Sequence, residues 1–141
     1  MSLLEKAIAI AVEAHTGEVD KAGQPYILHP LHLMMQMDTA EEMMTAVLHD
    51  VIEDTPITLD DLRQQGFPET VLEALALLTH DTASTSYEAY VAALKPNPLA
   101  RKVKLADLTH NMDVRRLPEM GMKDFGRLEK YRRAWETLTS N

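Results

Sequence analysis

The 141-residue sequence predicts an all-α fold, and three observations support this. Leu, Ala and Met are plentiful while aromatic residues make up only 5%, a composition that favours helices over sheets. Apolar residues recur every three or four positions along most of the chain, which is the period of amphipathic helices. No segment alternates polar and apolar residues as a half-buried strand does. The length suits one domain, so we expect residues 1–141 to form a single helical bundle.

The expected helices are separated by short polar breaks, the first of them a loop from Gly17 to Gln24. In chain order the helices cover residues 2–15, 30–37, 40–53, 58–66, 68–78, 87–94, 98–113 and 123–139. Pro30 and Pro68 suit the first turn of a helix, and Thr58 with Asp61 forms a capping-box pattern. The last helix is expected to bury one face, made of Leu128, Tyr131, Trp135 and Leu138.

The composition excludes several kinds of protein. Without cysteine there is no disulfide scaffold or thiol nucleophile, and any metal must bind through His, Asp, Glu or water. No apolar run approaches the roughly 20 residues that span a bilayer, and the N-terminus lacks the pattern of a signal peptide. The net charge of −8 opposes binding to a nucleic-acid backbone. We therefore expect a cytoplasmic protein that binds neither nucleic acid nor membrane.

Residues 48–55, LHDVIEDT, concentrate polar groups in an apolar setting. In one helix His49 and Glu53 are four apart, as are Asp50 and Asp54, so an imidazole and three carboxylates share neighbouring faces. The surrounding Leu, Val and Ile residues push the same segment into the core, where unpaired polar groups are costly. This conflict is resolved if the segment binds a ligand or a metal.

Two further segments complete a candidate metal site. In KVKLADLTHNMD, residues 102–113, Lys104, Asp107 and Asn111 recur on one helix face, and GQPYILHP contributes His29. Two imidazoles and two carboxylates suit Mn²⁺, Fe²⁺, Co²⁺, Ni²⁺ or Zn²⁺ and leave positions for water or substrate. The simpler alternatives are a solvated helix end for the acids and an ion pair between Asp107 and Lys104.

The order H…HD…D resembles the HD superfamily. More narrowly, AHTGEVDKAGQPYILHP, VLHDVIEDT and VKLADLTHNM resemble the hydrolase domain of RelA/SpoT proteins and the small alarmone hydrolases, over roughly residues 1–138. The resemblance implies a compact HD-domain bundle of helices around one Mn²⁺. It also implies hydrolysis of a nucleotide phosphoester, namely removal of the 3′-pyrophosphate from guanosine tetra- and pentaphosphate, (p)ppGpp.

Particular residues match the roles known in that family. The resemblance makes His29, His49, Asp50 and Asp107 the metal ligands, and it makes Glu53 and Asp54 the acids that position or deprotonate the attacking water. It implies substrate contacts for four further residues, which are Lys21, Asn111, Arg127 and Tyr131. The other histidines, His15, His32, His80 and His110, fall outside the pattern and are expected to be packing or surface residues, although His110 adjoins Asn111.

The sequence departs from the family at Asp20, where relatives carry an arginine that packs on the purine base. An aspartate cannot stack in this way, so the base that is read stays open. One alternative is therefore an HD-type nucleotidase or phosphatase acting on another phosphorylated metabolite, and another is a nucleotide sensor without catalysis. The chain has no residues for the synthetase domain of the long RelA/SpoT proteins, so we expect degradation without synthesis.

Overall fold

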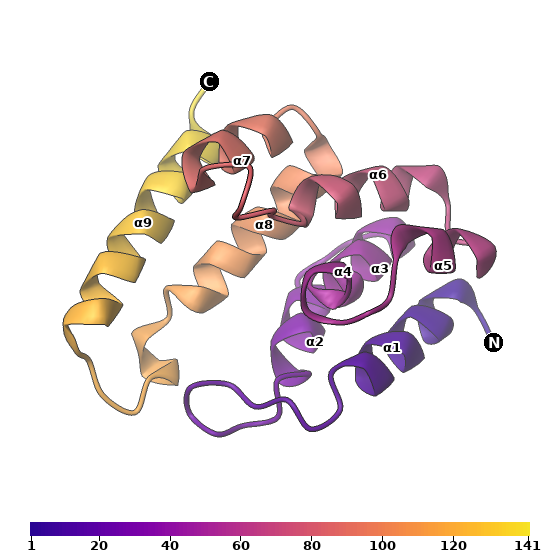
Figure 1. The fold of residues 1–141 in the computed structure, drawn as a ribbon, viewed down its shortest axis with the longest axis horizontal. Coiled ribbons are helices and arrows are strands. Elements are labelled where there is room, and N and C mark those ends of the chain that lie inside the picture. The colour runs from indigo at the N-terminus through magenta and orange to yellow at the C-terminus, as the bar shows by residue number, and fades with distance from the viewer.

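Helices alone build the fold, in agreement with the sequence (Figure 1). The computed structural model describes residues 1–141, and its elements are α1 (Leu3–Ala14), α2 (Leu28–Met35), α3 (Ala40–Leu48), α4 (Val51–Asp54), α5 (Leu59–Gln64), α6 (Glu69–Leu78), α7 (Tyr87–Leu94), α8 (Pro98–Asn111), the short 3₁₀ helix η1 (Val114–Arg116) and α9 (Met122–Thr139). The one β feature is an isolated bridge between Val19 and Pro25, in the loop that joins α1 to α2.

Local capping signals explain most helix boundaries. The hydroxyls of Ser2, Thr39 and Thr58 accept hydrogen bonds from the third residues of α1, α3 and α5, each within a complete capping box. α6 begins at Glu69, with Pro68 at the N-cap position immediately before the helix and not in its first turn. The start of α2 differs, because the helix begins at Leu28, so His29 lies inside its first turn instead of in front of it.

The predicted continuous helix over residues 40–53 is wrong, because the structure interrupts it between Leu48 and Val51. The Nδ1 atom of His49 hydrogen-bonds the carbonyl of Ala46 at 2.8 Å, and the His49 amide donates to the same oxygen. That carbonyl is the acceptor that the Asp50 amide would use in a continuous α-helix. The His49 side chain thus displaces the helical bond, and α4 starts as a new turn after Asp50.

α3 lies at the centre and packs against α1, α2, α6 and α8. Two groups of buried apolar side chains meet around it: one joins α1, α3, α5 and α6, and the other joins α2, α3 and α6 to α9. On α9 the buried residues are Ala134 and Leu138, whereas Trp135 is 43% exposed, so the predicted inward position of Trp135 is wrong. None of the helices is both long and apolar enough to cross a membrane.

Candidate metal centre and ligand pocket

Four predicted ligands from three parts of the chain meet inside the bundle. His29 comes from α2, His49 and Asp50 come from the break between α3 and α4, and Asp107 comes from α8. The Nε2 atom of His49 lies 2.9 Å from Asp50 Oδ2 and 3.5 Å from Asp107 Oδ1. His29 Nε2 lies 2.9 Å from the same Asp107 oxygen. We call these four residues the His/Asp cluster.

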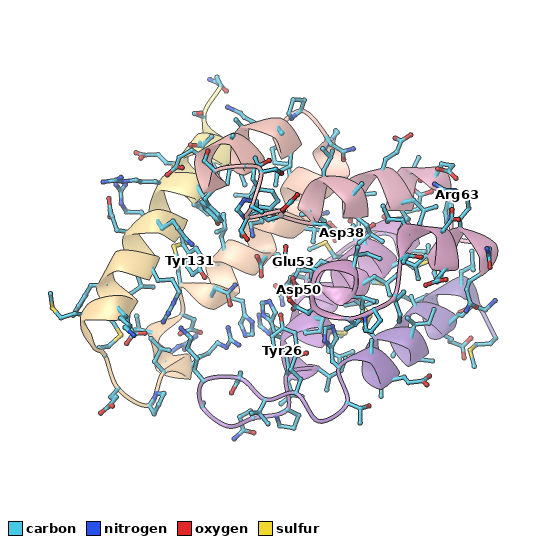
Figure 2. All side chains as sticks on the ribbon, in the orientation of Figure 1. Tyr26, Asp38, Asp50, Glu53, Arg63 and Tyr131 are labelled. Atoms are coloured by element: carbon cyan, nitrogen blue, oxygen red, sulfur yellow. The ribbon has the colours of Figure 1, made fainter.

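The cluster is buried to a degree that is rare for polar side chains. The buried polar residues of the whole chain are His15, His29, Thr45, His49 and Asp107, so three of the five belong to the cluster. Ligand atoms of His29, His49 and Asp50 all lie within 4.8 Å of one another, close enough to hold a metal ion. Figure 2 shows Asp50 near the middle of the molecule, between Tyr26 and Glu53.

Asp107 is fixed by its own helix. Lys104 Nζ donates to Oδ2 at 2.8 Å, and the Asn111 amide donates to Oδ1 at 3.0 Å, as the spacing along α8 predicted. Burial alone would raise the pKa of Asp107, but the Lys104 ammonium and the imidazoles of His29 and His49 hold this pKa well below its usual range. Asp107 is therefore an anionic group, and its ion pair with Lys104 coexists with its place beside the imidazoles.

His49 has the electronic form that a metal ligand needs. Its Nδ1 donates to the Ala46 carbonyl, so in the neutral ring Nε2 carries the lone pair. Nε2 is buried and, although it lies within ion-pair distance of two carboxylates, it makes no aligned hydrogen bond. Burial lowers the pKa of His49, yet Asp50 and Asp107 outweigh burial and raise this pKa well above its usual value. The two carboxylates thus favour positive charge at Nε2, carried by a proton or by a metal ion in its place.

His29 is oriented by a residue outside the predicted site. Its Nδ1 lies 2.7 Å from Nδ1 of His110, while its Nε2 points to Asp107. Burial and the Arg116 charge lower the pKa of His110 to about 4, so this ring is neutral and can accept a hydrogen bond from the Nδ1–H of His29. His32 stacks on the other side of His110, with the ring centres 3.9 Å apart. His110 therefore leaves Nε2 of His29 free to act as a ligand.

Asp50 also has a dedicated partner, Tyr26, whose hydroxyl donates a hydrogen bond to Oδ2. The Tyr26 ring lies between the imidazoles of His15 and His29, with ring centres 4.9 Å and 5.7 Å away. Burial and the Asp50 charge raise the pKa of Tyr26, which keeps the hydroxyl protonated and able to donate. Tyr26 thus holds Asp50 in place from the loop side.

The donor set fits a divalent cation. Two imidazoles and two carboxylates face one another, and Lys104 is the lysine that pairs with Asp107. The buried Nε2 of His49, without a hydrogen-bond partner, lies where such an ion would be bound. Nitrogen and oxygen donors of this kind suit first-row divalent metals. The His/Asp cluster can therefore hold a metal ion.

The two predicted acids, Glu53 and Asp54, are the last two residues of α4. Glu53 lines a cavity of about 240 Å³ together with His49, Asp50 and Asp107, and its Oε1 accepts the His80 amide at 2.7 Å. Asp54 does not line that cavity. Burial, together with the charges of Asp50, Glu53 and Glu18, raises the pKa of Asp54 to about 6. Both groups are exposed to solvent, so water reaches them.

A second cavity of about 410 Å³, the ligand pocket, adjoins His29 on the other side of Asn111. It contains all four predicted substrate contacts, which are Lys21, Asn111, Arg127 and Tyr131. Asn111 and Tyr131 line both cavities, so the pocket and the His/Asp cluster form one continuous site. Tyr131 projects from α9 opposite Asp50 (Figure 2). Arg127 is already paired with Asp124, one turn earlier on α9.

Three site residues escaped the sequence analysis. Tyr26 and Arg116 were not singled out, and His110 was placed with the packing residues, although its position beside Asn111 was a signal. His15 and His80 do have packing surroundings, with His15 buried against Glu18 and His80 bonded to the Thr85 carbonyl. His32 is exposed and touches the site only through His110.

Comparison with known proteins identifies relatives of the RelA/SpoT kind. No protein-family model matches the sequence. The chain is 33% identical over 124 residues to the bifunctional (p)ppGpp synthase/hydrolase SpoT of Escherichia coli (strain K12), which covers 77% of this chain and 17% of that protein. It is 35% identical over 116 residues to guanosine-3′,5′-bis(diphosphate) 3′-pyrophosphohydrolase of Haemophilus influenzae, covering 73% of this chain and 17% of that protein.

The fold has a solved counterpart as well. A metazoan ortholog of SpoT that hydrolyses ppGpp superposes with a TM-score of 0.78 at 19% identity, over 99% of this chain and 87% of that one. This likeness shows that the two proteins share a fold. The curated relatives are much longer, and the chain spans only 17% of the SpoT sequence. In sequence and in fold, the chain resembles the hydrolase domain of RelA/SpoT proteins, which confirms the resemblance predicted from its motifs.

Proposed function

We propose that the protein is a metal-dependent phosphohydrolase that removes the 3′-pyrophosphate from (p)ppGpp or a closely related nucleotide. The observation that carries this proposal is the meeting of His29, His49, Asp50 and Asp107 beside a pocket that contains Lys21 and Arg127. The (p)ppGpp hydrolases among its sequence relatives support the choice of substrate.

The His/Asp cluster would hold the metal, with Mn²⁺ as our first choice and Fe²⁺, Co²⁺, Ni²⁺ or Zn²⁺ as the alternatives. A divalent cation would supply Lewis-acid chemistry, polarising a phosphoryl oxygen and making a nearby water more acidic. Tyr26 and His110 keep Asp50 and His29 in their binding orientations through the hydrogen bonds described above.

Glu53 and Asp54 are the groups that accept and exchange the proton of the attacking water. In the hydrolysis a water oxygen forms a bond to the 3′-phosphorus, the bond from that phosphorus to the 3′ oxygen breaks, and a proton goes to the 3′ oxygen. Glu53 lies in the same cavity as the cluster and accepts the proton of the attacking water. As the bond to the 3′ oxygen breaks, Glu53 returns the proton to that oxygen, and Asp54, with its pKa of about 6, changes protonation near neutral pH and exchanges protons with solvent.

The remaining residues hold the nucleotide. Lys21 and Arg127 offset phosphate charge in the ligand pocket, and Asn111 and Tyr131 stand where this pocket meets the cluster. The net charge of −8 does not oppose this role, because the pocket carries its cations locally.

The test is a product assay with ppGpp, using protein stripped of metal and then reloaded with Mn²⁺. We expect release of pyrophosphate and GDP only in the reloaded sample, and a loss of about a hundredfold or more in kcat for Glu53→Gln with metal content unchanged. Release of orthophosphate would instead identify a nucleotidase, the alternative raised by Asp20. Nucleotide binding without any product would identify a sensor.

A further inference from the structure

The loop at Asp20 is held by the aspartate itself. Its Oδ1 accepts hydrogen bonds from the amides of Ala22 and Gln24, both at 2.9 Å, while Gly23 takes a positive φ of 81° at the loop tip. These two hydrogen bonds occupy Oδ1 and fix the direction in which the other oxygen, Oδ2, points. Asp20 is therefore a structural part of the ligand pocket, with one oxygen left to face another group.

The group that it faces is Arg116, at the end of η1. Arg116 Nη2 lies 3.8 Å from Asp20 Oδ2, although the two residues come from opposite ends of the chain. In Figure 1 the loop between α1 and α2 lies beside the segment between α8 and α9 at the bottom of the view. Arg116 Nη1 donates to the His110 carbonyl at 3.0 Å and to Asn111 Oδ1 at 3.3 Å. The guanidinium is thus tied to the residue that joins pocket and cluster.

These contacts determine what the arginine can still offer. All N–H groups of a guanidinium lie in its plane, and here the Nη1 side has two acceptors and the Nη2 side faces a carboxylate. The Arg116 side chain nevertheless lines the ligand pocket and is 26% exposed. The surfaces still open to a ligand are therefore the Nε–H edge and the flat face, and the flat face binds aromatic rings by stacking.

The local charge also opposes a phosphate at this point. Asp20 and Asp113 line the same pocket as Arg116, and Asp20 directly neutralises part of its charge. Lys21 has no ion pair within the chain and is the more favourable partner for phosphate oxygens. An uncharged planar group suits the neutralised arginine better than an anion does.

We propose that Arg116, held in plane by Asn111, the His110 carbonyl and Asp20, forms a stacking subsite for the purine base of the nucleotide. The proposal rests on the proposed function and adds to it the residue that reads the base. It also gives the substitution at Asp20 a physical meaning. In this chain the planar guanidinium is that of Arg116 in η1, and Asp20 orients it.

The test compares Arg116→Lys, which keeps the charge but loses the plane, with Arg116→Ala. The probes are ppGpp in turnover, and GDP and inorganic pyrophosphate separately in calorimetry with Mn²⁺ present. We expect both variants to raise KM for ppGpp and to weaken GDP binding about tenfold, with pyrophosphate binding and metal content unchanged. Arg63→Ala is the control, because this exposed arginine of α5 pairs with Asp60 and Glu69 and lines neither the ligand pocket nor the cavity beside the His/Asp cluster.

The outcomes separate the two proposals. Wild-type affinity for GDP in both Arg116 variants, or full rescue by Arg116→Lys, would overturn the stacking subsite while leaving hydrolysis untouched. Weakened pyrophosphate binding would overturn it too, because Arg116 would then be a phosphate ligand. If wild-type protein releases no pyrophosphate from ppGpp yet binds GDP through Arg116, the proposed reaction fails and the subsite stands. Thermal unfolding of each variant separates loss of folding from loss of binding.

Discussion

The His/Asp cluster and the ligand pocket touch each other but are built in opposite ways. His29, His49 and Asp107 are buried on helices of the central bundle, and each has a partner that fixes its orientation. Lys21 and Arg116 of the pocket come from the connections on either side, and both are reached by solvent. A change in the cluster must therefore disturb the core, whereas the pocket can change with little cost to folding.

The difference explains where the chain departs from the RelA/SpoT hydrolase domains that it resembles. The substitution at Asp20 lies in a loop and is accommodated by two amide hydrogen bonds and a facing arginine. An equivalent change at Asp107 would leave the Lys104 ammonium buried without its carboxylate. The His/Asp cluster is thus fixed by the core, whereas the ligand pocket can vary at its edge.

The largest effect is expected from Asp107→Ala, which tests whether the cluster is as indispensable as its burial indicates. The change removes a carboxylate beside both imidazoles, so we expect loss of metal and a fall in activity of about a thousandfold or more. Because it also breaks a buried ion pair, the free energy of unfolding should drop by about 3 kcal/mol. Metal analysis, product release and chemical denaturation measure the three effects.

Asp38→Ala is the matched control on the outer side of α8. Asp38 pairs with Lys102 at 2.7 Å, much as Asp107 pairs with Lys104 at 2.8 Å, but its side chain is 82% exposed. Such a surface pair contributes under about 1 kcal/mol, and no change in metal content is expected. Equal losses in the two variants would mean that burial does not distinguish the cluster.

Contacts within one helix could be predicted from the sequence, while contacts between distant segments could not. The group Lys104, Asp107 and Asn111 follows from helical spacing alone, and the structure contains both hydrogen bonds that it implies. The pairing of His29 with His110 joins residues 81 positions apart, and no periodicity announces it. The contact between Arg116 and Asp20 could not be predicted for the same reason.

The prediction of a continuous helix through His49 and Asp50 failed for a different reason. Residues 40–53 have good helical spacing throughout, so the pattern favours one continuous helix. The break depends on a side-chain nitrogen that takes the Ala46 carbonyl, an interaction that propensity does not register. The four predicted ligands nevertheless meet, because the break changes the directions of the His49 and Asp50 side chains while α3 still packs against α2 and α8.

His110→Phe tests whether the cluster depends on residues that hold its ligands. Phenylalanine keeps the ring stack with His32 but removes the nitrogen that lies 2.7 Å from His29 Nδ1. We expect metal affinity to fall about 10- to 100-fold, with activity recovering in excess Mn²⁺. His32→Phe is the control, since this ring touches no ligand directly, and it should bind metal normally. Unchanged metal affinity in His110→Phe would show that His110 does not orient His29 for metal binding.

Arg127→Ala moves the comparison to the ligand pocket. Loss of a charged contact to phosphate should raise KM for ppGpp about tenfold, with kcat changing less than about threefold and metal content unaffected. Arg132→Ala is the control on the same helix, because its side chain is 55% exposed and pairs with Glu129 and Glu136. A large fall in kcat at saturating ppGpp would show that the pocket shares in the chemistry and would weaken the separation drawn between the two regions.

The smallest effect concerns stability at Asp54, at the end of α4 near Asp50. Its pKa is raised from 3.8 to about 6 by burial and by Asp50, Glu53 and Glu18, against a small opposing effect of His15. A carboxyl whose pKa is raised by folding destabilises the folded state when ionised, and the penalty disappears as the pH falls through about 6. In metal-free protein Asp54→Asn should therefore raise the melting temperature by up to about 3 °C at pH 8 and by progressively less toward pH 5, since solvent screening keeps the gain below about 1 kcal/mol. Asp60→Asn, at a 74% exposed aspartate that pairs with Arg63, should give no such gain. A stabilisation by Asp54→Asn that is equal at both pH values would mean that the charge of Asp54 is not its cause.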